Sequence, residues 1–466
     1  MKKKIERRFV AVVIAFMLAF SCNGSFRAFA EETDHDNSEQ AQIATDPDED
    51  EPLRDNPATI PGQWIYNNTV GKWWYRHTDG TFTSNDWEYI SDAWYHFDAA
   101  GWMQTGWLYD NSHWYYLNPS NGAMVTGWKQ IDNNWYYFKS NGQMVTGWRQ
   151  ISNAVGTYWY FFKTNGQMVT GWKTITGYTY FFNSLGQMVT GWKTITGYSY
   201  FFNSNGQLQD TTRRAIVIAN SDSSNEAELN GWQNCLSDMT FYQDSQFVRI
   251  EKRSAPSYEV FCDLIDDVMS DANESDITYL CLSCHGSSSG LLRLCSDSYV
   301  TGQMLHALLD SYNGKVILFL SACYAGTIID RGQSGNPEDV FLSDFIGDTR
   351  SGELANEKYI VLCSSASTEY SFGYKVMYNN AINELDIATH CWTRGGGWDI
   401  HANQPAQMYA DIDHNSIVTL SELYSYSTNH LFDGLENYVN TNNIEQHVAV
   451  YSADNNFTIF EKQSER

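Results

Sequence analysis

A tryptophan that recurs at nearly constant spacing constrains the fold of the first half of this 466-residue chain more than any other feature. Successive copies are separated by 20, 21, 20, 24 and 20 residues, and the longer spacing coincides with an insertion near Val155: Trp87, Trp107, Trp128, Trp148, Trp172 and Trp192. A fixed period of this length is typical of a repeat array, in which each unit contacts only its neighbours. Residues 61–210 are therefore predicted to form such an array.

Each unit has the pattern of one β-hairpin. In the unit that begins at Thr170, the alternating aromatic residues Tyr178, Tyr180 and Phe182 are followed by a turn that contains glycine and by a short Gln-Met-Val segment. An isolated hairpin is only marginally stable in water, so neighbouring units must bury their aromatic faces against one another. The predicted fold class of the first half is an all-β solenoid of hairpin repeats.

After Asp210 the repeats stop, and apolar strands begin to alternate with amphipathic helices. The predicted elements are five strands, at 214–220, 247–250, 277–283, 315–322 and 358–365, and three helices, at 228–241, 258–269 and 302–312. This alternation predicts a mainly parallel sheet with helices on both faces and with functional residues at the carboxyl ends of its strands. Residues 211–466 are therefore predicted to form an α/β domain.

The first residues of the chain have the features of a secreted protein. Residues 1–8 are basic and residues 9–20 are apolar but too few to span a bilayer, and small residues follow, so a signal peptide is predicted at 1–30. Residues 31–60 are acidic and nearly free of aromatic residues, which predicts a disordered linker. Because no other stretch is long and apolar enough for a membrane helix, we expect the mature protein to reach the cell wall or cell surface by binding, without a transmembrane anchor.

Charge and cysteine usage argue against a nucleic-acid-binding protein and against a disulfide-linked one. The net charge of -26 argues against a nucleic-acid partner, because phosphate binding needs a basic face. Eight of the nine cysteines lie after residue 230, and several fall inside apolar strands. Cysteines of a disulfide framework would instead join loops, so free thiols are expected.

The repeats resemble a known class of wall-binding module. Residues 105–128 (TGWLYDNSHWYYLNPSNGAMVTGW) and 126–148 (TGWKQIDNNWYYFKSNGQMVTGW) closely resemble the choline-binding and glucan-binding cell-wall repeats of Gram-positive surface proteins. The resemblance implies a cell-wall polymer as partner, either a choline-bearing teichoic acid or a glucan. In the choline-binding family, aromatic residues of one hairpin and the next form a box around the ligand. Carried over, one box contains Trp107, Trp114 and Trp135 and the next Trp128, Trp135 and Trp159, and the full set of predicted ligand-binding residues is Trp107, Trp114, Trp128, Trp135, Trp148, Trp159, Trp172, Tyr178 and Trp192.

Aromatic boxes suit a quaternary ammonium ion. Such an ion cannot donate a conventional hydrogen bond, but each ring face attracts it by about 0.5 to 2 kcal/mol. Several weak sites in a row then gain affinity by multivalency. In the last two units Tyr178 and Tyr198 are predicted to replace the second tryptophan, and aromatic platforms also stack on sugars, so choline and glycan are both candidate ligands. The same rings are expected to form the core of the solenoid.

Two strands of the second half end in residues suited to nucleophilic catalysis. The strand at 277–283 continues into Cys284, His285 and Gly286, and the strand at 315–322 continues into Cys323. Adjacent parallel strands would bring His285 and Cys323 to one edge of the sheet, where the imidazole would lower the pKa of the thiol. Strand alternation sends Cys284 to the opposite face, so it is predicted to be a core residue.

A strand that ends in His-Gly, followed by a strand that ends in Ala-Cys-x-x-Gly, resembles the superfamily of caspases, legumains, metacaspases and clostripain. The likeness extends from about Arg214 to the end of the fifth strand. It implies a cysteine endopeptidase that hydrolyses a protein or peptide substrate and needs no cofactor for catalysis. By this resemblance Cys323 is the nucleophile, His285 protonates the leaving amine, and the backbone N–H groups of Gly286 and Cys323 form the oxyanion hole. Members that prefer a basic side chain often carry an acid two residues before the cysteine, where this chain has Ser321.

Two interpretations of the whole chain remain open. The first is a secreted, surface-retained cysteine endopeptidase with a His285/Cys323 dyad. The second is a surface adhesin whose α/β domain has no activity and binds a host or protein partner.

Residues 411–422 match the twelve-residue calcium-binding loop. The predicted ligands are at positions 1, 3, 5, 7, 9 and 12 of the loop, namely Asp411, Asp413, Asn415, Ile417, Thr419 and Glu422. Ser416 occupies the position where the sharp turn normally needs glycine, which should weaken binding. A helix pattern follows at 420–432, so the same residues also fit a capped helix start that needs no ion.

Overall fold

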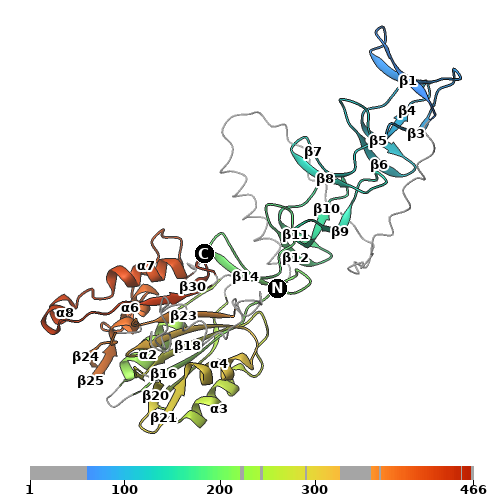
Figure 1. Cartoon of the computed structure of the whole chain (residues 1–466). Helices are drawn as coiled ribbons and strands as arrows, with labels where there is room; N and C mark the ends of the chain where they lie inside the picture. The colour runs from blue at the N-terminus through green and yellow to red at the C-terminus, as the bar shows by residue number, and fades with distance from the viewer. Residues whose placement is uncertain are drawn as a thin grey trace. The chain divides into compact units, whose positions relative to one another are not determined.

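The computed structural model describes residues 60–220, 225–241, 245–288, 291–325, 358–366, 369–452 and 454–462. The predicted signal peptide and, apart from Ile60, the predicted linker lie outside these ranges. Figure 1 shows the described elements with the labels used below. None of the helices in the described ranges has the length and apolar character needed to cross a membrane.

Residues 62–202 form seven antiparallel hairpins, drawn in blue to green in Figure 1. The hairpins pair β1 (Gly62–Asn67) with β2 (Lys72–His77), β3 (Asp86–Ile90) with β4 (Ala93–Phe97), β5 (Gly106–Asp110) with β6 (His113–Leu117), β7 (Gly127–Ile131) with β8 (Asn134–Phe138), β9 (Gly147–Ser152) with β10 (Thr157–Phe162), β11 (Gly171–Ile175) with β12 (Tyr178–Phe182), and β13 (Gly191–Ile195) with β14 (Tyr198–Phe202). A short strand, β15 (Leu208–Gln209), adds to the last hairpin. The prediction of hairpin repeats is confirmed.

Neighbouring hairpins are held together by a recurring set of aromatic contacts. The ring of Trp128 lies 5.0 Å from that of Tyr160 in the next hairpin and 5.8 Å from that of Phe162. The phenylalanine at this position is buried in five hairpins: Phe97, Phe138, Phe162, Phe182 and Phe202. Each hairpin thus completes the core of its neighbour, as a unit that cannot bury its own face requires.

In five of the turns, a methionine of one unit packs on the glycine of the following unit. Gly142 has a φ of +84°, and a Cβ at this position would overlap the Sδ of Met124. Glycine adopts such a conformation without steric cost and leaves room for the sulfur. This contact explains why a glycine recurs in the turn of the repeat.

The second half contains one six-stranded sheet in the order β17–β16–β18–β22–β23–β29. Its strands are β16 (Arg213–Ala219), β17 (Phe247–Ser254), β18 (Ile277–Ser283), β22 (Lys315–Ser321), β23 (Tyr359–Cys363) and β29 (Ala449–Tyr451). Neighbours among the first five are parallel, whereas β29 runs antiparallel to β23. The sheet is therefore mixed, with the predicted parallel strands and an edge strand that the sequence did not predict.

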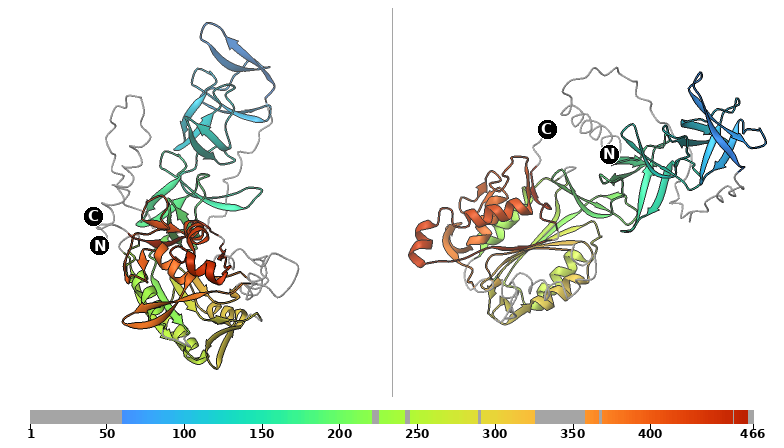
Figure 2. Two further views of the ribbon diagram at one scale, coloured as in Figure 1. Left: turned by 90° about the vertical axis from the view of Figure 1, so that its left-hand side faces the viewer. Right: turned by 45° about the horizontal axis from the view of Figure 1, so that its top comes forward.

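Helices cover both faces of this sheet. One apolar core joins Val217 and Phe319 to helices α2 (Glu226–Ser237), α6 (Ile387–Gly395) and α7 (Leu420–His430), and the other joins Ile218 and Leu318 to α3 (Tyr258–Met269) and α4 (Gly302–Asp310). In Figure 2 the yellow helices and the red helices lie on opposite sides of the sheet. Alternate residues of each strand thus enter different cores, as the period of two requires.

Smaller elements surround the sheet. They are β19 (His285–Gly286), β20 (Leu291–Cys295) and β21 (Ser298–Thr301) in one small sheet, the pairs β24 (Gly373–Tyr378) with β25 (Ala381–Asp386), β26 (Trp398–Asp399) with β27 (Gln404–Pro405), and β28 (Ile417–Thr419) with β30 (Thr458–Glu461), and helix α8 (Glu436–Asn442). All eight cysteines after residue 230 are free thiols.

Candidate functional site

The two predicted catalytic residues follow neighbouring parallel strands. Ser283 at the end of β18 pairs in register with Ser321 at the end of β22, and the N–H of Cys284 donates to the carbonyl of Ser321 over 2.9 Å. His285 and Cys323 each lie two residues beyond that pair. Both therefore leave the sheet at its carboxyl edge, and His285 is exposed there.

Gly286 brings the two segments into backbone contact. A Cβ at this position would overlap the carbonyl oxygen of Cys323 and lie 2.9 Å from its carbonyl carbon. His285 and Gly286 also pair with β20 opposite Arg293 and Leu292. The absence of a side chain at Gly286 therefore leaves room for the backbone of Cys323.

The thiol of Cys323 is half-buried and donates to the carbonyl oxygen of Ser371, which lies 3.3 Å from Sγ. Burial raises the pKa of the Cys323 thiol, and the negative charge of Asp386 raises it further, although the contact with Ser371 and the backbone N–H of Cys323 itself oppose the shift. The sequence predicted a lowered pKa for this thiol. The prediction was wrong because it considered only the imidazole and not desolvation of the sulfur.

Two carboxyl groups, the half-buried Asp386 and the buried Glu228, lie beneath this edge. Asp386 caps helix α6, accepts from the N–H groups of Ala388 and Thr389, and accepts from the Ser371 hydroxyl over 2.7 Å. Glu228 of α2 accepts from the Asp386 N–H over 2.9 Å. Burial, and next the charge of Asp386, raise the pKa of Glu228 to about 8, so this carboxyl is mostly protonated at neutral pH.

Two serines that follow β23 fix the backbone around Cys323. The N–H of Ala322 donates to the Ser364 hydroxyl over 3.0 Å, and the Ser365 hydroxyl donates to the Ala322 carbonyl over 2.9 Å. Both serines are fully buried. These serines were not predicted to be functional. Their position directly after a buried strand could have indicated it, because functional residues lie at the carboxyl ends of such strands.

Cys284 lies where strand alternation placed it. Its side chain packs against the core that contains Leu318, and burial raises its pKa. Cys284, although it is next to His285 in sequence, is therefore unsuited to nucleophilic attack at neutral pH.

Three hairpins of the array present two tryptophans that meet nearly at right angles. The ring centroids are 6.1 Å apart for Trp107 and Trp114, 6.3 Å for Trp128 and Trp135, and 6.3 Å for Trp148 and Trp159, with interplanar angles of 86° to 89°. Trp114 and Trp135 are 44% and 42% exposed, so a ligand can reach them. Each pair is formed within one hairpin, and the third ring of each box, from the next hairpin, stays a prediction.

Tyr178 does not occupy the position of a second tryptophan. In β7–β8, Trp135 pairs with Gln130, and the equivalent partner of Thr174 in β11–β12 is Thr179. Tyr178 precedes Thr179 by one position, so its side chain faces the other side of the hairpin. The same register places Ser199 rather than Tyr198 opposite Thr194. Trp172 and Trp192 therefore lack a second tryptophan, and the prediction of Tyr178 as a ligand-binding residue is corrected.

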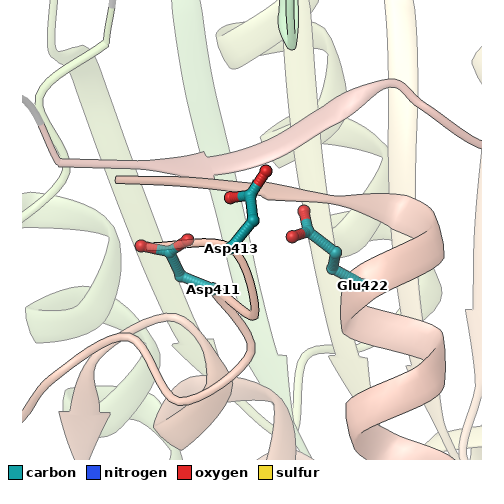
Figure 3. A group of neighbouring side chains, drawn as sticks. All are labelled: Asp411, Asp413 and Glu422. Atoms are coloured by element: carbon teal, nitrogen blue, oxygen red, sulfur yellow. The ribbon is translucent and has the colours of Figure 1, made fainter. Parts of the chain in front are cut away.

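The calcium-like loop brings three carboxylates together. One oxygen from each of Asp411, Asp413 and Glu422 lies within 4.8 Å of the others, and Figure 3 shows two of them on the loop and the third on α7. A single calcium ion coordinated at about 2.3 to 2.6 Å could bridge such oxygens. Ser416 has a φ of +68°, so it does adopt the left-handed turn that glycine normally provides. Thr419 and Glu422 form a capping box at the start of α7, so the alternative of a capped helix is also realised.

A family model matches the array. Residues 84–126, 125–170 and 169–208 match the family described as choline-binding repeat. Among solved structures, choline binding protein F of Streptococcus pneumoniae is 38% identical over 32% of this chain and 47% of its own, with a TM-score of 0.29. CbpJ of Streptococcus pneumoniae is 35% identical over 32% of this chain and 52% of its own, with a TM-score of 0.29. The cell wall endolysin of phage Cp-1, in complex with choline, is 36% identical over 34% of this chain and 39% of its own, with a TM-score of 0.21.

This chain therefore spans about half the length of the first two structures. A search of curated proteins finds no match. The hairpins from residue 84 to residue 208 are thus similar to choline-binding repeats.

Proposed function

We propose that this protein is a secreted, wall-associated cysteine endopeptidase of the caspase-like type, with Cys323 as nucleophile and His285 as its acid and base. The observation that carries the proposal is the close approach of the Gly286 and Cys323 backbones at the carboxyl edge of a mainly parallel sheet. This is the edge at which such sheets place functional residues. The register of β18 and β22 supports a shared position for the two side chains.

The chemistry begins from a neutral thiol, because burial raises the pKa of Cys323. His285 takes the thiol proton as the sulfur attacks the scissile carbonyl carbon, and the same proton then passes to the leaving amine as the C–N bond breaks. The N–H groups of Gly286 and Cys323 stabilise the oxyanion. Water then hydrolyses the thioester, and the free thiol returns.

Peptide hydrolysis tests this proposal. The full chain should cleave at least one member of a fluorogenic peptide panel that carries Arg, Lys, Asn or Asp at the scissile bond, and Cys323→Ala should remove that activity. Cys284→Ala is the matched control and should retain it, since Cys284 is a core residue. If the correctly folded parent cleaves no peptide of the panel, the result would favour the adhesin.

We further propose that the array holds the protein on choline-bearing wall polymers. The three perpendicular tryptophan pairs support this, because each offers two ring faces to one trimethylammonium group. A glucan is the alternative ligand, since the same rings can stack on sugars. Retention on a choline resin with release by free choline, and no retention on glucan, distinguishes the two.

Trp135→Ala should weaken binding to choline. The substitution removes one wall of a pair but leaves Trp128 in its contacts with Tyr160 and Phe162. With about 0.5 to 2 kcal/mol lost per ring, the site should bind choline roughly 2- to 30-fold more weakly. Tyr178→Ala is the matched control, because Tyr178 is an aromatic side chain, 53% exposed, on the other face of its hairpin. Equal effects of the two variants would contradict this assignment of the sites.

We also propose that Asp411, Asp413 and Glu422 bind calcium. Extracellular loops of this kind bind at about 0.1 to 1 mM, so 10 mM calcium should stabilise the fold by about 1 to 3 kcal/mol. For a domain of this size that is a rise in Tm of roughly 3 to 10 °C. Asp413→Asn should abolish the rise, and the exposed Glu259→Gln should not. A calcium-independent Tm in the parent would favour the capped helix alone.

A further inference from the structure

Among the described residues, no further hairpin of the array follows β13–β14, yet its tryptophan keeps the usual contact. Along the array, a tryptophan meets an aromatic ring of the next hairpin, as Trp172 does with Tyr200 at 4.9 Å and 75°. At the end, Trp192 meets Phe457 at 5.3 Å and 66°. Phe457 belongs to the α/β domain and is 1% exposed. A residue of the second half therefore takes the place of the next repeat.

A cation of the chain itself lies over both rings. The Nζ of Lys315 is 5.8 Å from the centroid of Trp192 and 5.0 Å from that of Phe457. Cations within about 6 Å of a ring face are attracted to it, and more strongly when they are removed from water. Lys315 is 5% exposed and is the first residue of β22, the strand that leads to Cys323.

Hydrogen bonds surround this aromatic contact. The Thr458 hydroxyl donates to the carbonyl of Gly197 over 2.6 Å, and the Thr458 N–H donates to the Ser199 hydroxyl over 2.9 Å. Nearby, the Thr194 hydroxyl donates to a carboxylate oxygen of Asp454 over 2.7 Å. Thr194 and Ser199 pair across the hairpin at the position where Gln130 and Trp135 pair in the fourth hairpin. The residue that would complete a tryptophan pair is thus a serine that binds the α/β domain.

We propose that the hairpin β13–β14 is a docking surface for the α/β domain rather than a choline site, with the ammonium of Lys315 in the place that a ligand cation takes beside the other tryptophans. The partner of this surface is the edge formed by Phe457, Thr458 and Asp454. Choline binding then ends before the last hairpin, and this end of the array is fixed to the strands that carry the candidate dyad. Only the choline part of this inference rests on the proposed wall binding.

Amide hydrogen exchange of the full chain tests the docking. Lys315→Met keeps the apolar length but removes the charge, and Thr458→Val keeps the shape but removes the hydroxyl. Each should raise the exchange rates of residues 191–202 at least tenfold. Lys193→Met is the matched control, since Lys193 is an exposed lysine on the same hairpin. Exchange that changes less than twofold in both test variants would overturn the docking.

The number of choline ions bound per chain tests the claim that the hairpin β13–β14 is not a choline site. In equilibrium dialysis with labelled choline, Trp192→Leu should leave the number of ions bound per chain unchanged, whereas Trp135→Ala should lower it. A loss of one bound ion in Trp192→Leu would overturn the assignment of this hairpin. If the parent binds no choline at all, the proposed ligand is wrong, and the exchange rates still decide the docking.

Discussion

Gly286→Ala should slow peptide hydrolysis about 100-fold and destabilise the α/β domain by about 3 kcal/mol, a cost at the upper end of the usual range for overpacking. The added Cβ would overlap the Cys323 carbonyl oxygen, which belongs to backbone and cannot rotate away. Either the His285 segment or the Cys323 segment must move. A displacement of about 1 Å at such a site typically costs roughly 100-fold in rate. Hydrolysis assays and urea denaturation measure the two effects.

Gly373→Ala is the matched control, because a Cβ there would come no closer than 3.2 Å, to a flexible atom of Glu384. This variant should lose little stability and retain activity. If Gly286→Ala behaved in the same way, the backbone contact between the two segments would not exist as described.

Glu228→Gln should stabilise the protein at alkaline pH by about 2 to 5 kcal/mol and have little effect below pH 5. The pKa of Glu228 is about 8 in the folded protein, against an ordinary value of 4.5 for a glutamate carboxyl. The folded state therefore holds a proton that the unfolded chain releases, and stability falls as pH rises from about 4.5 to 8. A shift of this size corresponds to up to about 5 kcal/mol. The glutamine keeps the acceptor for the Asp386 N–H but has no proton to lose.

The measurement is the free energy of unfolding of parent and variant across pH 5 to 9. The difference between them should grow with pH and level off above about pH 8. Glu259→Gln, on the exposed side of α3, should differ from the parent by a small and constant amount. A constant difference for Glu228→Gln as well would mean that the buried carboxyl does not release its proton in this range.

Strand and helix positions near the dyad could be predicted because local pattern and tertiary burial agree there. The strand at 277–283 and the helix at 258–269 have the predicted bounds. The edge strand β29 and the pair β24–β25 were not predicted, because β29 has only three residues and β24 begins after a polar loop. Such elements are specified by contacts with distant parts of the chain rather than by the alternation of apolar and polar residues within them.

The candidate site was predictable only in its strand-end residues. The carboxyl edge of the sheet identified His285 and Cys323, since topology alone brings those positions together. Asp386 and Glu228 could not be assigned from sequence, because Asp386 ends an unpredicted strand and Glu228 lies on a helix 95 positions before Cys323 in the numbering. Burial and the charge of Asp386 both raise the pKa of Cys323. Because neither could be read from the sequence, the shift was predicted with the wrong sign.

Sequence alternation also misplaced one aromatic residue. The run Tyr178, Tyr180 and Phe182 suggested that Tyr178 replaces the second tryptophan, but the pairing of Thr174 with Thr179 shows a shift of one position. In a strand, one position reverses the face of the side chain. Register is set by the turn and by pairing with the partner strand, neither of which the aromatic pattern alone defines.

Covalent labelling of the full chain with a peptidyl acyloxymethyl ketone tests the central claim most directly. Peptide mass mapping should place the label on Cys323 alone among the eight cysteines after residue 230, and His285→Ala should reduce its rate of formation at least 100-fold. Label on Cys284 or another thiol, or a rate at Cys323 that does not depend on His285, would contradict the dyad.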